Sequence, residues 1–190
     1  MTGKELMEIV AQMGFAKTLD DNEPYFYQMT SLSLLQISRH FPLVKTITVE
    51  HKDGAEYYTE YDVGALCDDF RSFPEKPLRL GSLLLQEGRD FLIEGSRVRL
   101  ALGHEGNLEI RYCRRPCKVN ADTLHKELDI SPEALHLLPL LVSSYLWADE
   151  RAELASHYLA LFRSELSEAK KERFAHQMAS YHCGNGWDKG

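Results

Sequence analysis

The sequence predicts an α+β fold in which helices from both ends of the chain form a scaffold and a small antiparallel β module is inserted between them. Apolar residues recur at helical spacing near the N-terminus, alternate with polar residues over about 43–113, and return to helical spacing after Pro116. The chain has 190 residues, of which 44% are hydrophobic, and this suits one domain with an insertion. We therefore expect a single domain over 1–175 and a flexible C-terminal tail at 176–190.

Two helices are expected before the β module. The first covers about 3–16, where Leu6, Val10 and Met13 fall near helical spacing and Gly14 marks the end. The second covers about 30–40. Pro42 ends it, because proline lacks the N–H group that a helical hydrogen bond requires.

Strand-like alternation predicts the β-rich insertion at about 43–113. Residues 44–50 alternate branched apolar and polar side chains, which is typical of a half-buried strand. Asp53-Gly54 predicts a tight hairpin turn into a second strand near 56–61, and 103–107 predicts a second hairpin loop. Residues 63–70 are ambiguous, and one interpretation is a short helix capped by Asp62. Shorter strands are expected near 77–80, 83–86, 90–93, 97–102 and 108–112.

Helices are expected again over about 132–147 and 150–174. Ser131-Pro132-Glu133 has the residues of a helix start, and Pro139 predicts a kink or two consecutive short helices. The last helix carries an apolar seam at alternating steps of three and four, which is typical of packing against a neighbouring helix. The seam consists of Ala152, Ala155, Leu159, Phe162, Leu166 and Ala169.

The charge balance argues against a dedicated nucleic-acid-binding domain, because 29 acidic and 22 basic residues give a net charge of -7. No apolar run approaches the roughly 20 residues of a membrane span. The first residues lack the cationic and apolar regions of a secretory signal. We therefore expect assembly in a cytoplasm, with the four cysteines as free thiols.

The sequence predicts no catalytic, cofactor-binding or metal site. It lacks a G-x-S-x-G elbow, a Walker A motif and a G-x-G-x-x-G sequence after a strand. His176, His182 and Cys183 cluster near the C-terminus without the paired spacing of a zinc site. We therefore predict a protein that is not an enzyme and needs no cofactor.

One basic segment stands out in this acidic chain. Arg111, Arg114, Arg115 and Lys118 lie around Tyr112 and Pro116. One interpretation is that this charge meets an acidic partner or a phosphate backbone. The other is that the basic side chains protect an exposed edge strand from aggregation.

The order of several segments resembles the head–tail connector, or neck and adaptor, proteins of tailed bacteriophages and prophages. The segments are FPLVKTITV at 41–49, the I-x-Y-x-x-x-P pattern at 110–116, the threonine-led stretch at 123–128, LDISPEALHLLPLLVSSYLWADE at 128–150 and ERAELASHYLALFRSEL at 150–166. The resemblance spans roughly 30–170. In that family a proline-containing helix runs into a second helix with an Ala-x-x-Tyr-x-x-x-Phe pattern, which matches Ala155, Tyr158 and Phe162 here.

The resemblance implies a virion structural protein that forms a ring below the portal and continues the channel for packaged DNA. Such proteins typically form twelve-fold rings in the virion, and elements at their chain ends commonly order on docking. The implied partners are other copies of this chain, the portal protein and a further neck or tail protein. Packaged DNA is expected to pass through without specific binding, and no membrane is involved. The implied locations are the virion and, during assembly, the cytoplasm of the bacterial host.

We expect the partner interface to draw on the basic segment, the last helix and the C-terminal tail. Its expected residues are Arg111, Arg114, Arg115, Lys118, Tyr158, Phe162, His182 and Trp187.

An alternative function is a bacterial small-ligand-binding or regulatory module that uses the β insertion. Several aromatic residues of the insertion are candidates for lining a pocket, although core packing is the favoured explanation for them. These residues are Tyr57, Tyr58, Tyr61, Phe70 and Phe73.

Overall fold

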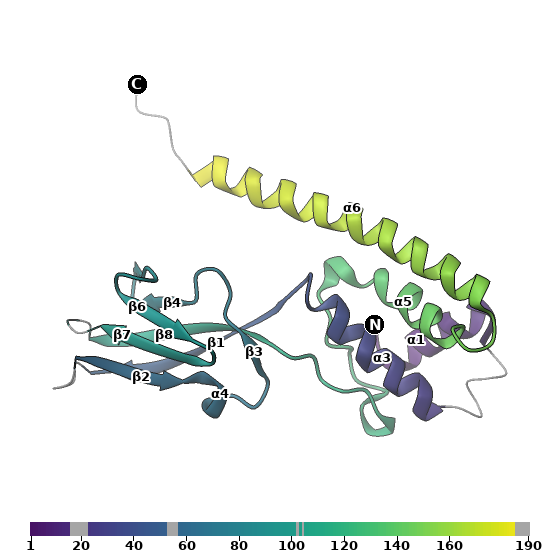
Figure 1. Cartoon of the computed structure of the whole chain (residues 1–190), viewed down its shortest axis with the longest axis horizontal. Helices are drawn as coiled ribbons and strands as arrows, with labels where there is room; N and C mark the ends of the chain where they lie inside the picture. Colours follow the sequence, from purple (N-terminus) through teal and green to yellow (C-terminus); the bar gives the residue numbers. More distant parts are fainter. Residues whose placement is uncertain (16–22, 53–56, 102, 104, 185–190) are drawn as a thin grey trace. The chain divides into compact units, whose positions relative to one another are not determined.

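A computed structural model describes residues 1–15, 23–52, 57–101, 103 and 105–184, with side chains as far as residue 175. It confirms the α+β fold with an inserted antiparallel β module (Figure 1). The chain divides into a helical unit, Met1–Phe41 with Cys117–Gly190, and a β unit, Pro42–Pro116. Each unit has a hydrophobic core of its own, whereas we expected a single domain over 1–175.

The helical unit begins with α1 (Gly3–Val10), which starts at a capping box. The Thr2 hydroxyl accepts from the Glu5 N–H, and the Glu5 carboxylate accepts from the Thr2 N–H. An irregular turn, Ala11–Phe15, follows, and Gly14 has a φ of 114° there. The first predicted helix therefore ends close to Gly14, as the sequence indicated.

The next helix, α3 (Glu23–Ile37), starts well before the predicted position near residue 30. Pro24 lies in its first turn, where the missing proline N–H has no helical partner to lose. Phe26 is fully buried and packs this first part of the helix into the core.

Two further helices complete this unit, α5 (Leu137–Leu146) and α6 (Ala152–Gly184). A 3-10 turn, Pro132–Ala134, precedes α5, so the expected break falls before Pro139, which lies in the first turn of α5. Helix α6 has 33 residues and runs through 176–184, where we expected a flexible tail. Residues 185–190 of the expected tail lie outside the described residues.

The β unit is a small sandwich of two antiparallel sheets. One sheet has the order β1 (Leu43–His51), β8 (Gly106–Arg114), β4 (Leu78–Leu80), β5 (Leu83–Leu84), and β3 (Phe70–Ser72) also pairs with β8. The other has the order β2 (Tyr58–Asp62), β7 (Arg97–Ala101), β6 (Phe91–Glu94). Inward side chains of both sheets make one core, including Leu78, Val98, Leu100, Leu108, Ile110 and Tyr112.

The two predicted hairpins are wrong. Strand β1 pairs with β8 along its whole length, from Leu43 opposite Arg114 to His51 opposite Gly106, while β2 lies in the other sheet. Strands β7 and β8 also lie in different sheets. In both cases the chain crosses between sheets because the inward apolar faces of the strands are buried against each other.

One hairpin joins β6 to β7 through Gly95 and Ser96, and Gly95 has a φ of 64°. Strands β4 and β5 also pair as a hairpin, with Leu80 opposite Leu83. Directly after β2, a partner strand of β7, the ambiguous segment forms α4 (Val63–Leu66). Asp62 caps α4, because its Oδ1 accepts from the Ala65 N–H at 3.2 Å. The short-helix interpretation is therefore confirmed.

In the part of the chain that the structure describes, no helix combines the length and the apolar surface that crossing a bilayer demands.

Candidate functional site

The basic segment does not act as an edge strand. Strand β8, which carries Arg111 and Arg114, pairs with β1 on one side and with β3 and β4 on the other, so it lies inside its sheet. The edge-protection interpretation is therefore wrong. Arg111 and Arg115 are exposed, and the Arg115 N–H donates to the Asp69 carbonyl at 2.7 Å. Lys118 lies in the helical unit, so the predicted cluster is divided between the two units.

The aromatic pair of α6 belongs largely to the core of its own unit. Phe162 is only 2% exposed, and Tyr158 is partly buried, with its hydroxyl 3.4 Å from the Met13 carbonyl that accepts from it. Phe162 therefore offers no surface to a partner in this conformation, and this part of the expected interface needs correction. His182 lies in α6, but its side chain is outside the described residues, as is the whole of Trp187.

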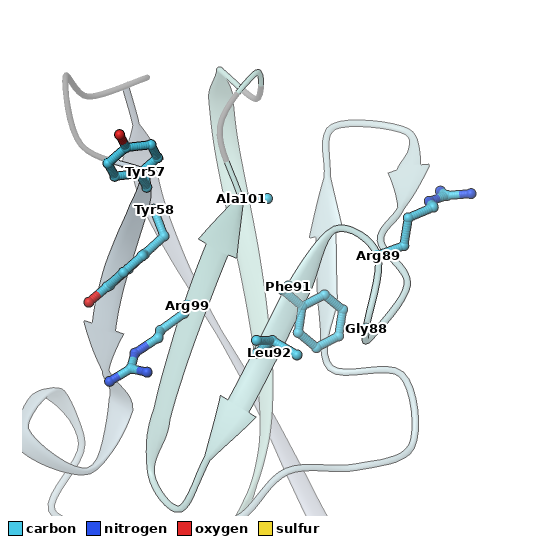
Figure 2. Close-up of a pocket in the computed structure, with 8 residues that line it drawn as sticks. All are labelled: Tyr57, Tyr58, Gly88, Arg89, Phe91, Leu92, Arg99 and Ala101. Atoms are coloured by element: carbon cyan, nitrogen blue, oxygen red, sulfur yellow. The ribbon is translucent and has the colours of Figure 1, made fainter.

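A pocket of about 310 Å³ opens on the outer face of the sheet β2-β7-β6 (Figure 2). Strand register explains its shape. Tyr58 lies opposite Ala101, and Leu92 lies opposite Arg99, so these four side chains point away from the core. Ala101 is the smallest of them and lies between Tyr58 on β2 and the apolar side chains of β6, which leaves a hollow over the middle strand. Gly88, Arg89 and Phe91 complete the lining with Tyr57.

The guanidinium of Arg99 forms part of the pocket lining. It lies 5.1 Å from the centre of the Tyr58 ring. Its Nε donates to Glu60 at 2.9 Å, and its Nη1 donates to Glu94 at 2.9 Å. The hydrogen bond to Glu60, opposed by partial desolvation, leaves the pKa of Arg99 above its usual value. The charge of Arg99 is therefore matched by carboxylates of the two flanking strands.

A second polar cluster lies in the other sheet. Asp69 accepts from the Tyr112 hydroxyl at 2.8 Å and from Lys45 Nζ at 3.4 Å. Desolvation works to raise the pKa of Asp69, but the Tyr112 hydrogen bond, Lys45 and the charge of Arg114 outweigh it and leave the pKa lowered. Burial, with the neighbouring Cys67 and Asp69, raises the pKa of Tyr112, so its phenol stays protonated as a donor. The Asp69 carboxylate thus links Tyr112 of β8 to Lys45 of β1.

Metal binding has no support in the described part of the chain, where no three histidine, cysteine or acidic side chains converge as a candidate site. The predicted cluster of His176, His182 and Cys183 has no described side chains.

The sequence identified only part of the pocket. Of the five aromatic candidates, Tyr57 and Tyr58 line it, while Tyr61, Phe70 and Phe73 pack against the core of the β unit. Ala101, Leu92 and Arg99 were missed, because their positions follow from which strands pair. The sequence predicted a strand near 97–102 but gave no sign of which residues lie beside Arg99 and Ala101.

Comparison with models of known protein families and with curated proteins finds no match to this chain.

Proposed function

We propose that this chain is a virion structural protein, a ring-forming connector or adaptor that docks between the portal and the tail and continues the DNA channel. The order of its helical segments and strand ends, which resembles phage neck proteins, supports this function. The strongest support comes from the length of α6. The helix is longer than the stretch of it that packs against the core.

Helix α6 has 33 residues, and a rise of about 1.5 Å per residue gives it a length of about 50 Å. Its side chains in contact with the core fall between Leu154 and Ala169. Arg173 then donates to the His40 carbonyl at 2.7 Å, and Phe174 beyond it is 64% exposed. The helix continues to Gly184, past the extent of α5 beside it (Figure 1).

A helical stretch that does not cover its own core gains most of its stability from a neighbour. In the proposed ring, that neighbour is the next copy of the chain or the portal. Leu32 on α3, with Leu161 and Phe174 on α6, provides exposed apolar surface that such a contact covers. A closed ring requires two different faces of each copy to meet, and a helix longer than the core it covers supplies one of them.

The net charge of -7 also suits a channel through which DNA slides. Like charge weakens contact with phosphates, so we expect no specific DNA binding. A salt-sensitive DNA affinity in the micromolar range or tighter would contradict this part of the proposal.

Co-expression tests the proposed function. The full chain is co-expressed with a portal protein from the same genome, the portal is captured, and the bound material is imaged in negative stain. We expect the chain to co-purify as a ring on the portal. Phe174→Glu should weaken this capture, whereas Ser156→Glu, which adds the same charge to the exposed start of α6, should not. A portal that is recovered without the wild-type chain would overturn the proposal.

The pocket favours the second candidate function, a small-ligand-binding module in a bacterial protein. Its volume of about 310 Å³ lies at the lower end of the range for small-molecule sites. Co-purification with the portal distinguishes this function from the first, because a bacterial regulatory module has no reason to bind one.

A further inference from the structure

We propose that the pocket on the outer face of the sheet β2-β7-β6 binds a neutral saccharide. This site belongs to the β unit alone, and it stands whether or not the chain is a connector.

The first step is the shape of the pocket. Ala101 forms a small floor on the middle strand, between Tyr58 on β2 and Leu92 on β6. The result is a shallow hollow of about 310 Å³ that is open to solvent along the sheet. A ligand in it keeps one face in water, which suits a molecule with hydroxyl groups around its whole edge better than a hydrocarbon.

The second step is the aromatic surface. Tyr57, just before β2, is 93% exposed, and Tyr58, the first residue of β2, is about half exposed, so two phenol rings reach solvent at this end of the strand. Arg99 stacks on Tyr58 and fixes its ring. A tyrosine offers an apolar face and a hydroxyl at its tip, and this matches a pyranose, with its C–H groups on one face and its hydroxyls at the rim.

The third step is the charge. Arg99 is engaged by Glu60 and Glu94, and Arg89 donates twice to Asp90, from Nε to Oδ1 and from Nη2 to Oδ2, at 2.9 Å each. Binding of a phosphate or a sulfate would compete with these carboxylates for the guanidinium groups. In Figure 2, Arg89 also points away from the tyrosines. The pocket is therefore matched to an uncharged ligand.

The experiment uses the full chain and a panel of neutral oligosaccharides: maltotriose, cellotriose, chitotriose and mannotriose. Saturation-transfer NMR detects binding, and calorimetry measures it. A sulfated heparin disaccharide serves as the anionic comparison. We expect at least one neutral sugar to bind with a dissociation constant of about 1 mM or tighter.

Two variants test the location of the site. Tyr58→Ala removes the stacking ring, and Ala101→Leu fills the floor while leaving the core intact, so it remains informative if the first variant folds poorly. We expect each to weaken binding by about tenfold or more. Leu84→Ala, an exposed change in the other sheet, is the matched control and should bind as the wild type does.

Three results would overturn the proposal: no binding of any neutral sugar in the panel, unchanged binding by Ala101→Leu, or preference for the sulfated sugar. None of these results depends on the portal, so failure here is separate from failure of the proposed function.

Discussion

Replacing Phe162 with alanine should destabilise the helical unit strongly, because the ring is part of its core. Phe162 is 2% exposed and packs among buried residues from other helices of the unit, including Leu34 and Leu141. Its removal loses the transfer free energy of a phenyl ring and leaves a cavity. Such changes cost about 3–5 kcal/mol of unfolding free energy, which is a large part of the roughly 5–15 kcal/mol available to a domain.

Phe174 provides the matched control in the same helix. It is 64% exposed, so little of its ring is covered, and alanine has the better helix propensity. We expect Phe174→Ala to cost about 1 kcal/mol or less.

Urea denaturation of both variants, followed by far-ultraviolet circular dichroism and by tryptophan fluorescence, measures the difference. Because the helical unit has its own core, we expect Phe162→Ala to lower the unfolding midpoint of the helical unit. Both signals should report this, since Trp147 packs against Phe15 in the same core as Phe162. Equal losses for the two variants would refute the assignment of Phe162 to the core and restore its predicted role in a partner interface.

Two further predictions concern the β unit. The lowered pKa of Asp69 gives stability that is present above the unfolded carboxyl value, about 3.9, and is lost as the pH falls through the folded value. The melting temperature of the β unit should therefore fall as the pH is lowered. Tyr112→Phe removes the hydrogen bond to Asp69 and should make this fall with pH shallower. An unchanged dependence of the melting temperature on pH would exclude that hydrogen bond as its cause. Gly95→Ala should cost about 1–2 kcal/mol in chemical denaturation, because φ is 64° and no neighbouring atom relieves or adds strain. Gly95→Asn should cost less, and a neutral alanine variant would contradict the turn geometry.

Periodicity predicted the elements well where the signal was local. The alternation at 44–50 and the helix start at 131–133 lie close to β1 and to the turn before α5. The cap at Asp62 was also predictable, since a side chain and an N–H three residues away determine it. Proline as a helix breaker was less informative, because its effect depends on its position in the helix: Pro24 and Pro139 both lie in first turns, where proline is tolerated.

Strand pairing could not be predicted in the same way. Asp53-Gly54 indicates a reversal of the chain, but whether the next strand pairs locally or crosses to another sheet depends on distant apolar faces. The inward residues of β1 and β8 meet because both strands bury one face, although more than 50 residues separate them in the sequence. The same limitation hid the pocket, since Ala101 and Leu92 become part of one surface only after β6, β7 and β2 pair.

The basic segment shows a related limit. Charge along the sequence identified Arg111 and Arg115 correctly as exposed, but it could not say that β8 is a central strand or that Lys118 lies in the other unit. Their role in partner binding remains a prediction.

The most direct test of the connector proposal is cryo-electron microscopy of the chain bound to its portal. The proposal predicts a closed ring, twelve-fold as in the resembling family, in which the part of α6 beyond Ala169 contacts a neighbouring copy or the portal. A bare portal ring beside free monomers of this chain would contradict it.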